Sequence, residues 1–179
     1  ADENASNYNQ DATYDDGSCI YETYFNCLPS FANPMITSIE QATINNESLD
    51  PFDEIAIFDG DLCVGSIQIP WDSSLPYTLI SASDNPDTEE IDGFIENNQI
   101  EVRFWDISSQ LELSNINIDI LSGNTVFTLL GYNTVNLSTE IIFGCTDESA
   151  CNYNVNANVN DATCEYPEED YNCAGICIS

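Results

Sequence analysis

The chain lacks histidine and contains a single Lys or Arg residue, Arg103, among 179 residues. Against this it has 32 Asp and Glu residues and a formal net charge of -31 at pH 7. Nucleic acids and anionic membranes are not expected as partners, because their phosphates are bound chiefly by Lys and Arg. Without histidine there is no Ser-His-Asp or Cys-His nucleophile and no His-ligated zinc site, so we do not expect an enzyme.

Long hydrophobic runs are also missing. No apolar run approaches the ~20 residues that a membrane-spanning helix needs, and no charged-then-apolar signal precedes Ala1. We therefore expect a mature, exported chain without membrane insertion. Hydrophobic residues still make up 42% of the sequence, which is enough for at least one region to bury a core.

Eight cysteines lie mostly near the two ends of the chain. Without histidine, closely spaced cysteines favour disulfides over zinc, although a four-cysteine zinc site is the alternative. Disulfides imply an oxidising setting, so we expect an extracellular or cell-surface location.

The most informative pattern is an internal repeat. Residues 2–21 align without gaps on residues 147–166 with ten identical positions of twenty, and Tyr24–Cys27 resembles Asp170–Cys173 after a one-residue slip. One position differs in kind, because Ser6 stands where the second copy has Cys151. In the same register Cys145 corresponds to a position just before Ala1, so we expect the chain to be an excerpt from a longer repeat-containing polypeptide.

Both copies are rich in the hard oxygen donors that suit Ca²⁺. A loop this short cannot build a core, so it needs a disulfide, a metal or both. The alternatives are that Asn and Asp only supply turn conformations, or that the acidic charge only maintains solubility. The candidate calcium ligands are Asp2, Asn7, Asn9, Asp11, Asp15 and Asp16 in the first copy and Asp147, Asn152, Asn154, Asn156, Asn160 and Asp161 in the second.

The repeat also suggests disulfide pairings. Cys145 with Cys164 would close the second copy, and Cys19 would by analogy bond a cysteine upstream of the chain. Cys151 would pair with Cys173 or Cys177, and Cys27 with Cys63. Spacing alone does not fix this connectivity.

Between the copies, short alternating apolar runs are separated by turn clusters, which predicts an all-β, immunoglobulin-like β-sandwich. The expected domains are a repeat at 1–27, the sandwich at 28–143 and a repeat at 144–179. Asp59-Gly60-Asp61 is expected to form a hairpin turn. The expected strands are Met35–Ile44, Glu54–Phe58, Leu62–Ile69, Tyr77–Ala82, Gln99–Trp105, Leu113–Leu121, Thr125–Leu130 and Thr134–Leu137.

The sandwich loops carry further candidate calcium ligands, Asp59, Asp61, Asp87 and Asp92, within two acidic clusters that also contain Asp53, Glu54, Asp84, Glu89 and Glu90. A solvated acidic loop is the alternative for each. Paired carboxylates also occur in glycosidases, but among 32 acids a pair is uninformative. The aromatic residues Trp71, Tyr77, Phe94 and Trp105 could stack on sugars, although such side chains more often belong to the core.

The segments Gly144–Asp147, Ala150–Asn154 and Cys164–Tyr166 resemble a GCTD, ACNYN, DDGSCEY-type repeat of very large secreted surface proteins of marine Bacteroidetes-type bacteria. The central segments Asp53–Gly65, Asp92–Phe94 and Phe104–Asp106 are similar to a β-sandwich module of the same proteins. The resemblance implies an exported adhesin, filament or multidomain exoprotein.

We therefore expect a structural repeat module, stiffened by calcium and disulfides, whose partners are neighbouring copies or modules of the same protein. The alternative is a carbohydrate-binding module with surface glycans as its partners.

Overall fold

The computed structural model describes residues 5–11, 13–14, 22–27, 33–71 and 74–177. The protein is all-β, and the described residues include no helix, hence none that could cross a lipid bilayer. The strands are β1 Met35–Ile44, β2 Glu47–Ser48, β3 Glu54–Asp59, β4 Leu62–Gln68, β5 Tyr77–Ser81, β6 Glu101–Asp106, β7 Leu111–Leu113, β8 Asn117–Ser122, β9 Tyr132–Thr139, β10 Phe143–Gly144 and β11 Val159–Asn160.

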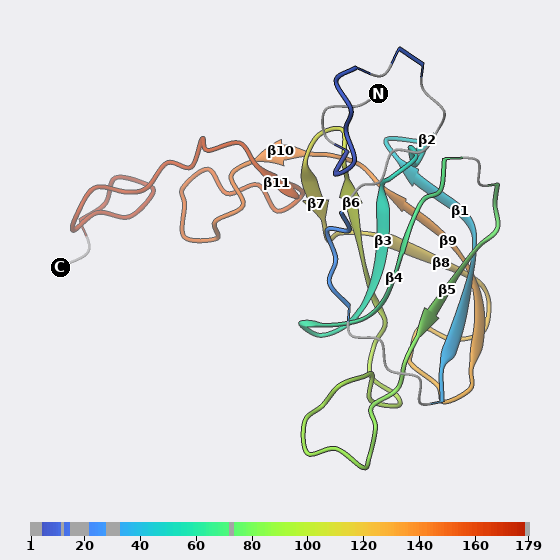
Figure 1. The fold of residues 1–179 in the computed structure, drawn as a ribbon. Helices are drawn as coiled ribbons and strands as arrows, with labels where there is room; N and C mark the ends of the chain where they lie inside the picture. The colour runs from blue at the N-terminus through green and yellow to red at the C-terminus, as the bar shows by residue number, and fades with distance from the viewer. Residues whose placement is uncertain (1–4, 12, 15–21, 28–32, 72–73, 178–179) are drawn as a thin grey trace.

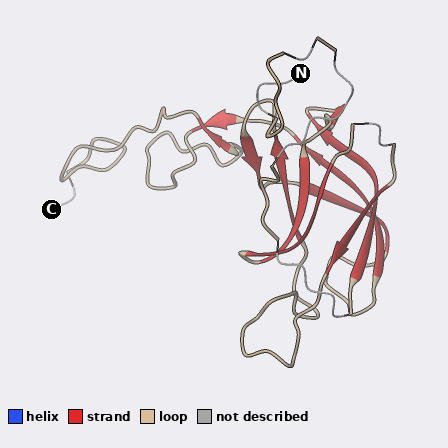
Figure 2. Cartoon of the chain, viewed as in Figure 1, coloured by secondary structure: helices blue, strands red, loops and turns tan. Residues whose placement is uncertain are grey.

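Nine of these strands form two sheets that face each other as a β-sandwich (Figures 1 and 2). One sheet has the order β2-β1-β9-β8 with β5 also paired to β1, and the other has the order β4-β3-β6-β7. The pairing of β1 with β9 is parallel, whereas the other pairs in both sheets are antiparallel.

The core lies between the two inner faces and follows from the two-residue period of the strands. In β6, Val102 and Phe104 are buried between more exposed neighbours, as the sequence predicted. Val135 and Leu137 do the same from β9. Burying each such side chain stabilises the fold by about 1.5–3 kcal/mol.

Two predicted strands are wrong. The run Leu113–Leu121 is divided between β7 and β8, which belong to different sheets, so the chain crosses from one layer to the other within it. The run Thr125–Leu130 contributes only an isolated bridge between Gln99 and Val126. Its apolar residues are nevertheless used, because Phe127 stacks on Phe94 in the core with ring centroids 4.6 Å apart.

The Asp59-Gly60-Asp61 turn joins β3 to β4 as a hairpin, and Gly60 adopts a left-handed φ of +59° that glycine tolerates without strain. The register of this hairpin places Phe58 opposite Cys63. Cys63, just after the turn, is therefore placed on the outer face of the sheet.

The second repeat leaves the sandwich through β10, which pairs in parallel with β11, and extends to one side of it (Figure 1). It contains no regular structure beyond these two short strands among its described residues. Cys145, Ala150 and Ala157 are its buried apolar residues. Such a small interior cannot fold a chain on its own, so the repeat depends on its covalent and turn-forming links.

Candidate functional site: a repeat segment docked on the sandwich

The outer face of the four-stranded sheet is covered by residues 22–27 of the first repeat, here called the docked segment. Alternation along β3 directs Ile55 and Ile57 into the core and Glu54, Ala56 and Phe58 outward. These outward residues are nevertheless only 1%, 0% and 6% exposed. A second, smaller apolar cluster explains this, because Phe25 packs there with Ala56 and Phe58.

Glu54 anchors the backbone of the docked segment. Its Oε1 accepts a hydrogen bond from the Tyr24 N–H at 2.7 Å, and its Oε2 accepts one from the Phe25 N–H at 3.0 Å. The Gln68 Nε2 also donates to Oε1, at 3.3 Å. Hydrogen bonds to a charged group contribute about 1.5–3 kcal/mol each, and a buried carboxylate without them would be costly. Glu54 therefore has a positioning role, not that of a calcium ligand.

The aromatic side chains of the docked segment continue the contact. The Tyr24 ring stacks on Trp105 with centroids 3.7 Å apart and planes 3° apart. The Phe25 ring meets Phe58 edge-on at 5.7 Å. The Tyr24 hydroxyl donates to Glu112 at 2.8 Å, and this hydrogen bond, followed by burial, raises the pKa of Tyr24.

Arg103, the only cation among the side chains, lies in the same place. Its guanidinium is 4.0 Å from the centre of the Phe58 ring, and its Nη1 donates to Glu112 at 3.1 Å. A cation over an aromatic ring contributes about 0.5–2 kcal/mol, more as water is excluded. Arg103 thus neutralises the carboxylate that also accepts the Tyr24 hydroxyl.

The docked segment ends in a covalent link, because Cys27 forms a disulfide with Cys63 of β4 across 36 residues. By the chain-entropy estimate, closing a loop of this size stabilises the folded state by about 4 kcal/mol. Hydrogen bonds, stacked rings and a disulfide therefore all fix the same six residues to the sandwich.

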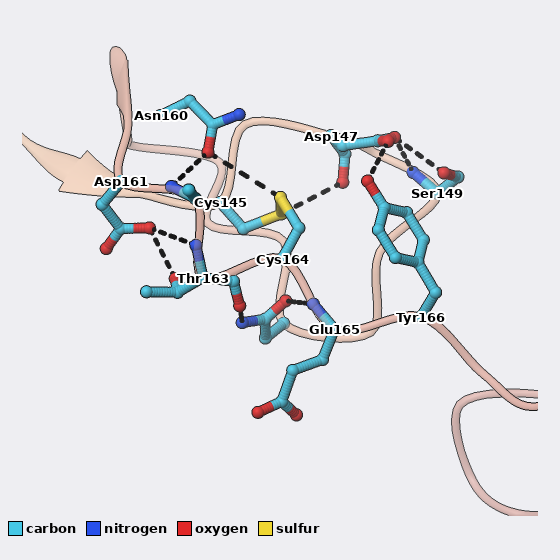
Figure 3. Close-up of a disulfide and its surroundings, with 11 residues drawn as sticks. Cys145, Asp147, Ser149, Asn160, Asp161, Thr163, Cys164, Glu165 and Tyr166 are labelled. Atoms are coloured by element: carbon cyan, nitrogen blue, oxygen red, sulfur yellow. Dashed lines mark hydrogen bonds between the residues drawn. A yellow bond between two sulfur atoms is a disulfide. The ribbon is translucent and has the colours of Figure 1, made fainter.

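The second repeat uses its polar side chains in another way, mainly in turns (Figure 3). Asp147 Oδ1 accepts from the Ser149 N–H at 2.9 Å, and its Oδ2 accepts from the Tyr166 hydroxyl at 2.7 Å. Asp161 Oδ1 accepts from both the backbone and the hydroxyl of Thr163. These bonds, with that of Tyr166 the largest cause at Asp147, lower the pKa of each of the two exposed carboxyls.

The Asn side chains of this repeat behave similarly. Asn152 is held at both ends, with Oδ1 accepting from the Glu165 N–H at 2.8 Å and Nδ2 donating to the Thr163 carbonyl at 2.6 Å. Two others each accept from the backbone N–H two residues on, Asn154 from Asn156 at 3.1 Å and Asn160 from Ala162 at 2.9 Å. These are Asx turns, the alternative that the sequence left open beside calcium.

Several of the candidate calcium ligands in the second repeat accept hydrogen bonds within turns. Asp147 and Asp161 lie on opposite sides of the Cys145–Cys164 disulfide (Figure 3). Across the part of the chain that the structure describes, no group of three or more Cys, Asp or Glu side chains is placed to hold a metal ion. Calcium takes six to eight oxygen ligands, which can include Asn and backbone carbonyl oxygens, so calcium binding to this repeat stays a prediction.

In the first repeat, Asp2, Asp15, Asp16 and Cys19 lie outside the described residues. Asn9 Oδ1 accepts from the Asp11 N–H at 3.0 Å, which is the same Asx turn as at Asn154 and Asn156 in the second copy. Asn7, the counterpart of Asn152, also has interaction partners. The two copies therefore share local geometry where both are described.

Acidic residues of the sandwich loops accept hydrogen bonds that hold loop segments together. Asp59 accepts hydrogen bonds from the Ile95 N–H and from Asn98 Nδ2, each at 2.8 Å, which ties the β3–β4 hairpin to the loop between β5 and β6. Asp92 accepts from the Asn85 N–H at 3.0 Å, and the Asp87 N–H donates to Asn85. Asp61 is fully exposed beside Arg103, at 3.9 Å.

Asp53, at the start of β3, is buried and accepts from the backbone N–H groups of Asp50 and Ile107, at 2.8 and 3.0 Å. Burial raises the pKa of its carboxyl to about 6, with the two backbone hydrogen bonds acting in the opposite direction and the nearby Asp106 and Asp50 raising it further. Its hydrogen bonds join the turn before β3 to the loop after β6.

The four candidate sugar-stacking aromatics occupy different places. Phe94 is in the core, Tyr77 packs against it, and Trp105 is covered by Tyr24 on one face. Trp71 is 62% exposed, with its ring tilted against Phe52 at 6.2 Å. They do not form a common stacking face.

Among the cysteines that the structure describes, the disulfides are Cys27–Cys63, Cys145–Cys164 and Cys151–Cys173. The sequence had left Cys173 and Cys177 open as partners of Cys151, and in the structure Cys177 is an exposed thiol. Three disulfides indicate a non-cytoplasmic, oxidising compartment.

Sequence reasoning missed the docked segment. It placed Glu54 in an acidic cluster and named Trp105 as either a core or a sugar-stacking residue, whereas both contact Tyr24. The available signals were two adjacent aromatic residues before a cysteine and the isolated position of Arg103. Comparisons with protein-family models, with curated proteins and with solved structures found no match.

Proposed function

We propose that the chain is a structural module of an extracellular surface protein, an adhesin or filament, in which a cysteine repeat and the sandwich that follows it form one stiff unit. The observation that carries the proposal is the docked segment, since six residues outside the sandwich bury Glu54 and Phe58 and end in the Cys27–Cys63 disulfide. A linker with such contacts cannot act as a flexible chain.

The composition supports the same proposal. The net charge of -31 opposes nonspecific aggregation and binding to polyanions, and the only basic side chain is used within the contact. The neighbours of such a module are further copies or modules of the same protein. The antiparallel pairs and strand lengths support an immunoglobulin-like sandwich as part of the proposal.

Small-angle scattering and ¹⁵N relaxation test this function. The first repeat and the sandwich are expected to tumble as one body in the native protein, and the Cys27→Ser/Cys63→Ser/Phe25→Ala variant is expected to show a larger radius of gyration and faster motion of residues 22–27. Equal tumbling in both proteins would contradict the stiffening role, and a matched Tyr171→Ala variant controls for loss of an aromatic residue.

Calcium binding to the repeats stays a prediction. In the second repeat the carboxylate and amide oxygens take part in turns, so the stiffness proposed here depends on disulfides and the docked segment. Treatment with EDTA without a reductant tests the calcium part. A melting temperature lowered by several degrees would support bound calcium, and an unchanged one would assign the stiffness to covalent links and turns alone.

A carbohydrate-binding role is the second candidate, favoured by an open polar groove of about 410 Å³ on the outer face of the five-stranded sheet. Gln41, Asn136 and Asp119 form one cross-strand row in it, and amide and carboxylate groups of this kind can bind sugar hydroxyls. A glycan array with the native protein and an Asn136→Ala variant tests this role. Selective binding lost in the variant would favour it over a purely structural one.

A further inference from the structure

Equivalent cysteines in the two repeats form disulfides with different partners. The tail of the first repeat, Tyr24–Cys27, corresponds in sequence to Asp170–Cys173 in the second. Cys27 bonds to Cys63 of the sandwich, whereas Cys173 bonds to Cys151 of its own repeat. One tail is therefore attached outward and the other is closed inward.

The two repeats also differ at the one position where a serine replaces a cysteine. Ser6 lines an open hollow beside Tyr24 and Trp105, and its counterpart Cys151 lines the corresponding hollow beside Tyr171 and Cys173. The backbone turn is the same at both places, because the Tyr8 N–H donates to the Ala5 carbonyl at 3.0 Å and the Tyr153 N–H donates to the Ala150 carbonyl at 3.3 Å. Position 6 thus lies beside Tyr24 of its tail, at the end of the docked segment away from the Cys27–Cys63 disulfide, and supplies no sulfur.

A second difference between the two tails also disfavours docking of the second tail on the four-stranded sheet. Tyr24, which stacks on Trp105, is replaced by Asp170 in the second tail. A carboxylate at that place would lose the stacking and would face Glu112, which accepts the Tyr24 hydroxyl in the first tail. Tyr171, the counterpart of the buried Phe25, is 42% exposed in its own repeat. The second tail is therefore a poor ligand for this sheet face.

We infer that the outer face of the four-stranded sheet is a docking surface for the tail of a cysteine repeat, and that the residue at the Ser6/Cys151 position selects which tails it accepts. A tail with two aromatic residues before its cysteine, in a repeat that has no cysteine at this position, is crosslinked to the sandwich. A repeat with a cysteine there closes on itself and leaves the sandwich face to another tail. This inference rests on the proposed stiffening function and names its partner.

The chemistry needs no external oxidant in a variant that restores the cysteine. In Ser6→Cys, Tyr24 and Phe25 must first leave the sheet, because position 6 and Cys27 lie at opposite ends of the docked segment. The new thiolate then attacks the Cys27 sulfur, the Cys27–Cys63 bond breaks, and a bond between position 6 and Cys27 forms. Cys63 leaves as a thiolate and takes a proton from water. One disulfide is consumed and one is formed, so the electrons balance.

Peptide mapping of the full chain after alkylation of free thiols tests the inference. In Ser6→Cys, Cys27 is expected to be linked to position 6 in most molecules, with Cys63 alkylated. Retention of the Cys27–Cys63 bond in most molecules, or a link from position 6 to any other cysteine, would overturn the inference. Ser6→Ala is the matched control and is expected to keep the native Cys27–Cys63 link.

A second variant keeps the test independent of folding defects at position 6. The protein Cys151→Ser/Asp170→Tyr/Tyr171→Phe has a free Cys173 thiol, and it is mixed with a second protein in which Cys27→Ser frees the Cys63 thiol. Oxidised glutathione is added as the two-electron oxidant, and it is reduced to glutathione as Cys173 of the first protein forms a disulfide with Cys63 of the second. Disulfide-linked heterodimers on a nonreducing gel would support the inference, and their absence would overturn it. Disulfide mapping does not depend on joint stiffness, so a failure here is distinguishable from a failure of the proposed function in scattering.

Discussion

The two repeats share half of the aligned residues and the same local turns. The first extends a disulfide-linked segment over a sheet of the sandwich, whereas the second contacts the sandwich near its own start, through Asn158 and Val159. The first buries Phe25 against a sheet and extends a disulfide to β4. The second has two internal disulfides and an exposed Tyr171 in place of Phe25. The comparison teaches that similar loop motifs can serve as a joint or as a self-contained spacer, depending on a few side chains.

The largest expected effect comes from removing the covalent link of the joint. Cys27→Ser/Cys63→Ser should lower the free energy of unfolding by about 4 kcal/mol on the chain-entropy estimate for a 36-residue separation. Urea denaturation measures it. The exposed thiol of Cys177 provides the control, since Cys177→Ser should leave the midpoint unchanged. Equal denaturation midpoints for the native protein and both variants would show that the Cys27–Cys63 disulfide does not stabilise the fold.

Phe25→Ala is the next largest change. It removes a buried ring from the cluster with Ala56 and Phe58 and should cost about 3 kcal/mol. Tyr171→Ala, at the equivalent position of the second repeat, should cost less than about 0.5 kcal/mol because the ring is exposed. Thermal melts of the two variants compare the repeats directly, and similar losses in both would break the distinction between them.

Glu54→Ala should cost about 2 kcal/mol, because the N–H groups of Tyr24 and Phe25 lose their acceptor in a buried place. Asp147→Ala in the second repeat should have a smaller effect, since that carboxylate is exposed to solvent. Denaturation at pH 7 measures both. A larger loss at Asp147 would show that turns outweigh the docked segment.

The smallest expected effect is a pH dependence of the folding stability, which arises at Asp53 in the sandwich and not in either repeat. Burial raises the pKa of Asp53 to about 6 from an ordinary value of 3.8, so the folded state favours the protonated carboxyl. Its contribution to stability is fully present below about pH 4 and is lost as pH rises through 6. Lowering the pH from 7 to 5 should stabilise the native protein by about 1 kcal/mol.

Denaturant midpoints between pH 5 and pH 7 measure this effect in the native protein and in Asp53→Asn, which cannot titrate. The variant should show a flatter profile over this range. A native midpoint that falls as the pH is lowered to 5 would contradict the assignment to Asp53.

Much of the sandwich could be predicted from sequence because its signals are local. The alternation of Val102 and Phe104 with Arg103 and Trp105 predicts which face of β6 is buried, and strand β1 has the predicted bounds. The hairpin at Gly60 follows from turn chemistry. The prediction of a single strand at Leu113–Leu121 was wrong because apolar content does not show where a chain passes from one sheet to the other.

The contact between the docked segment and the sandwich could not be predicted in the same way, since it joins residues about 30 to 90 positions apart. Tyr24 meets Glu54, Trp105 and Glu112, none of which has a periodic relation to it. The oxygen-rich spacing of the repeats is compatible with both metal ligands and Asx turns, and the hydrogen bonds at Asn154 and Asn160 identify turns without testing metal binding. Sequence composition alone does not contain that geometry.

Native-state hydrogen exchange at the Tyr24 and Phe25 amides tests the central claim most directly, because both N–H groups donate to the buried Glu54 carboxylate. The account predicts that these two amides exchange as slowly as those of the core strands, whereas the Ser149 and Thr163 amides in the exposed turns of the second repeat exchange much faster. Exchange of Tyr24 and Phe25 at the rate of those turns would contradict it.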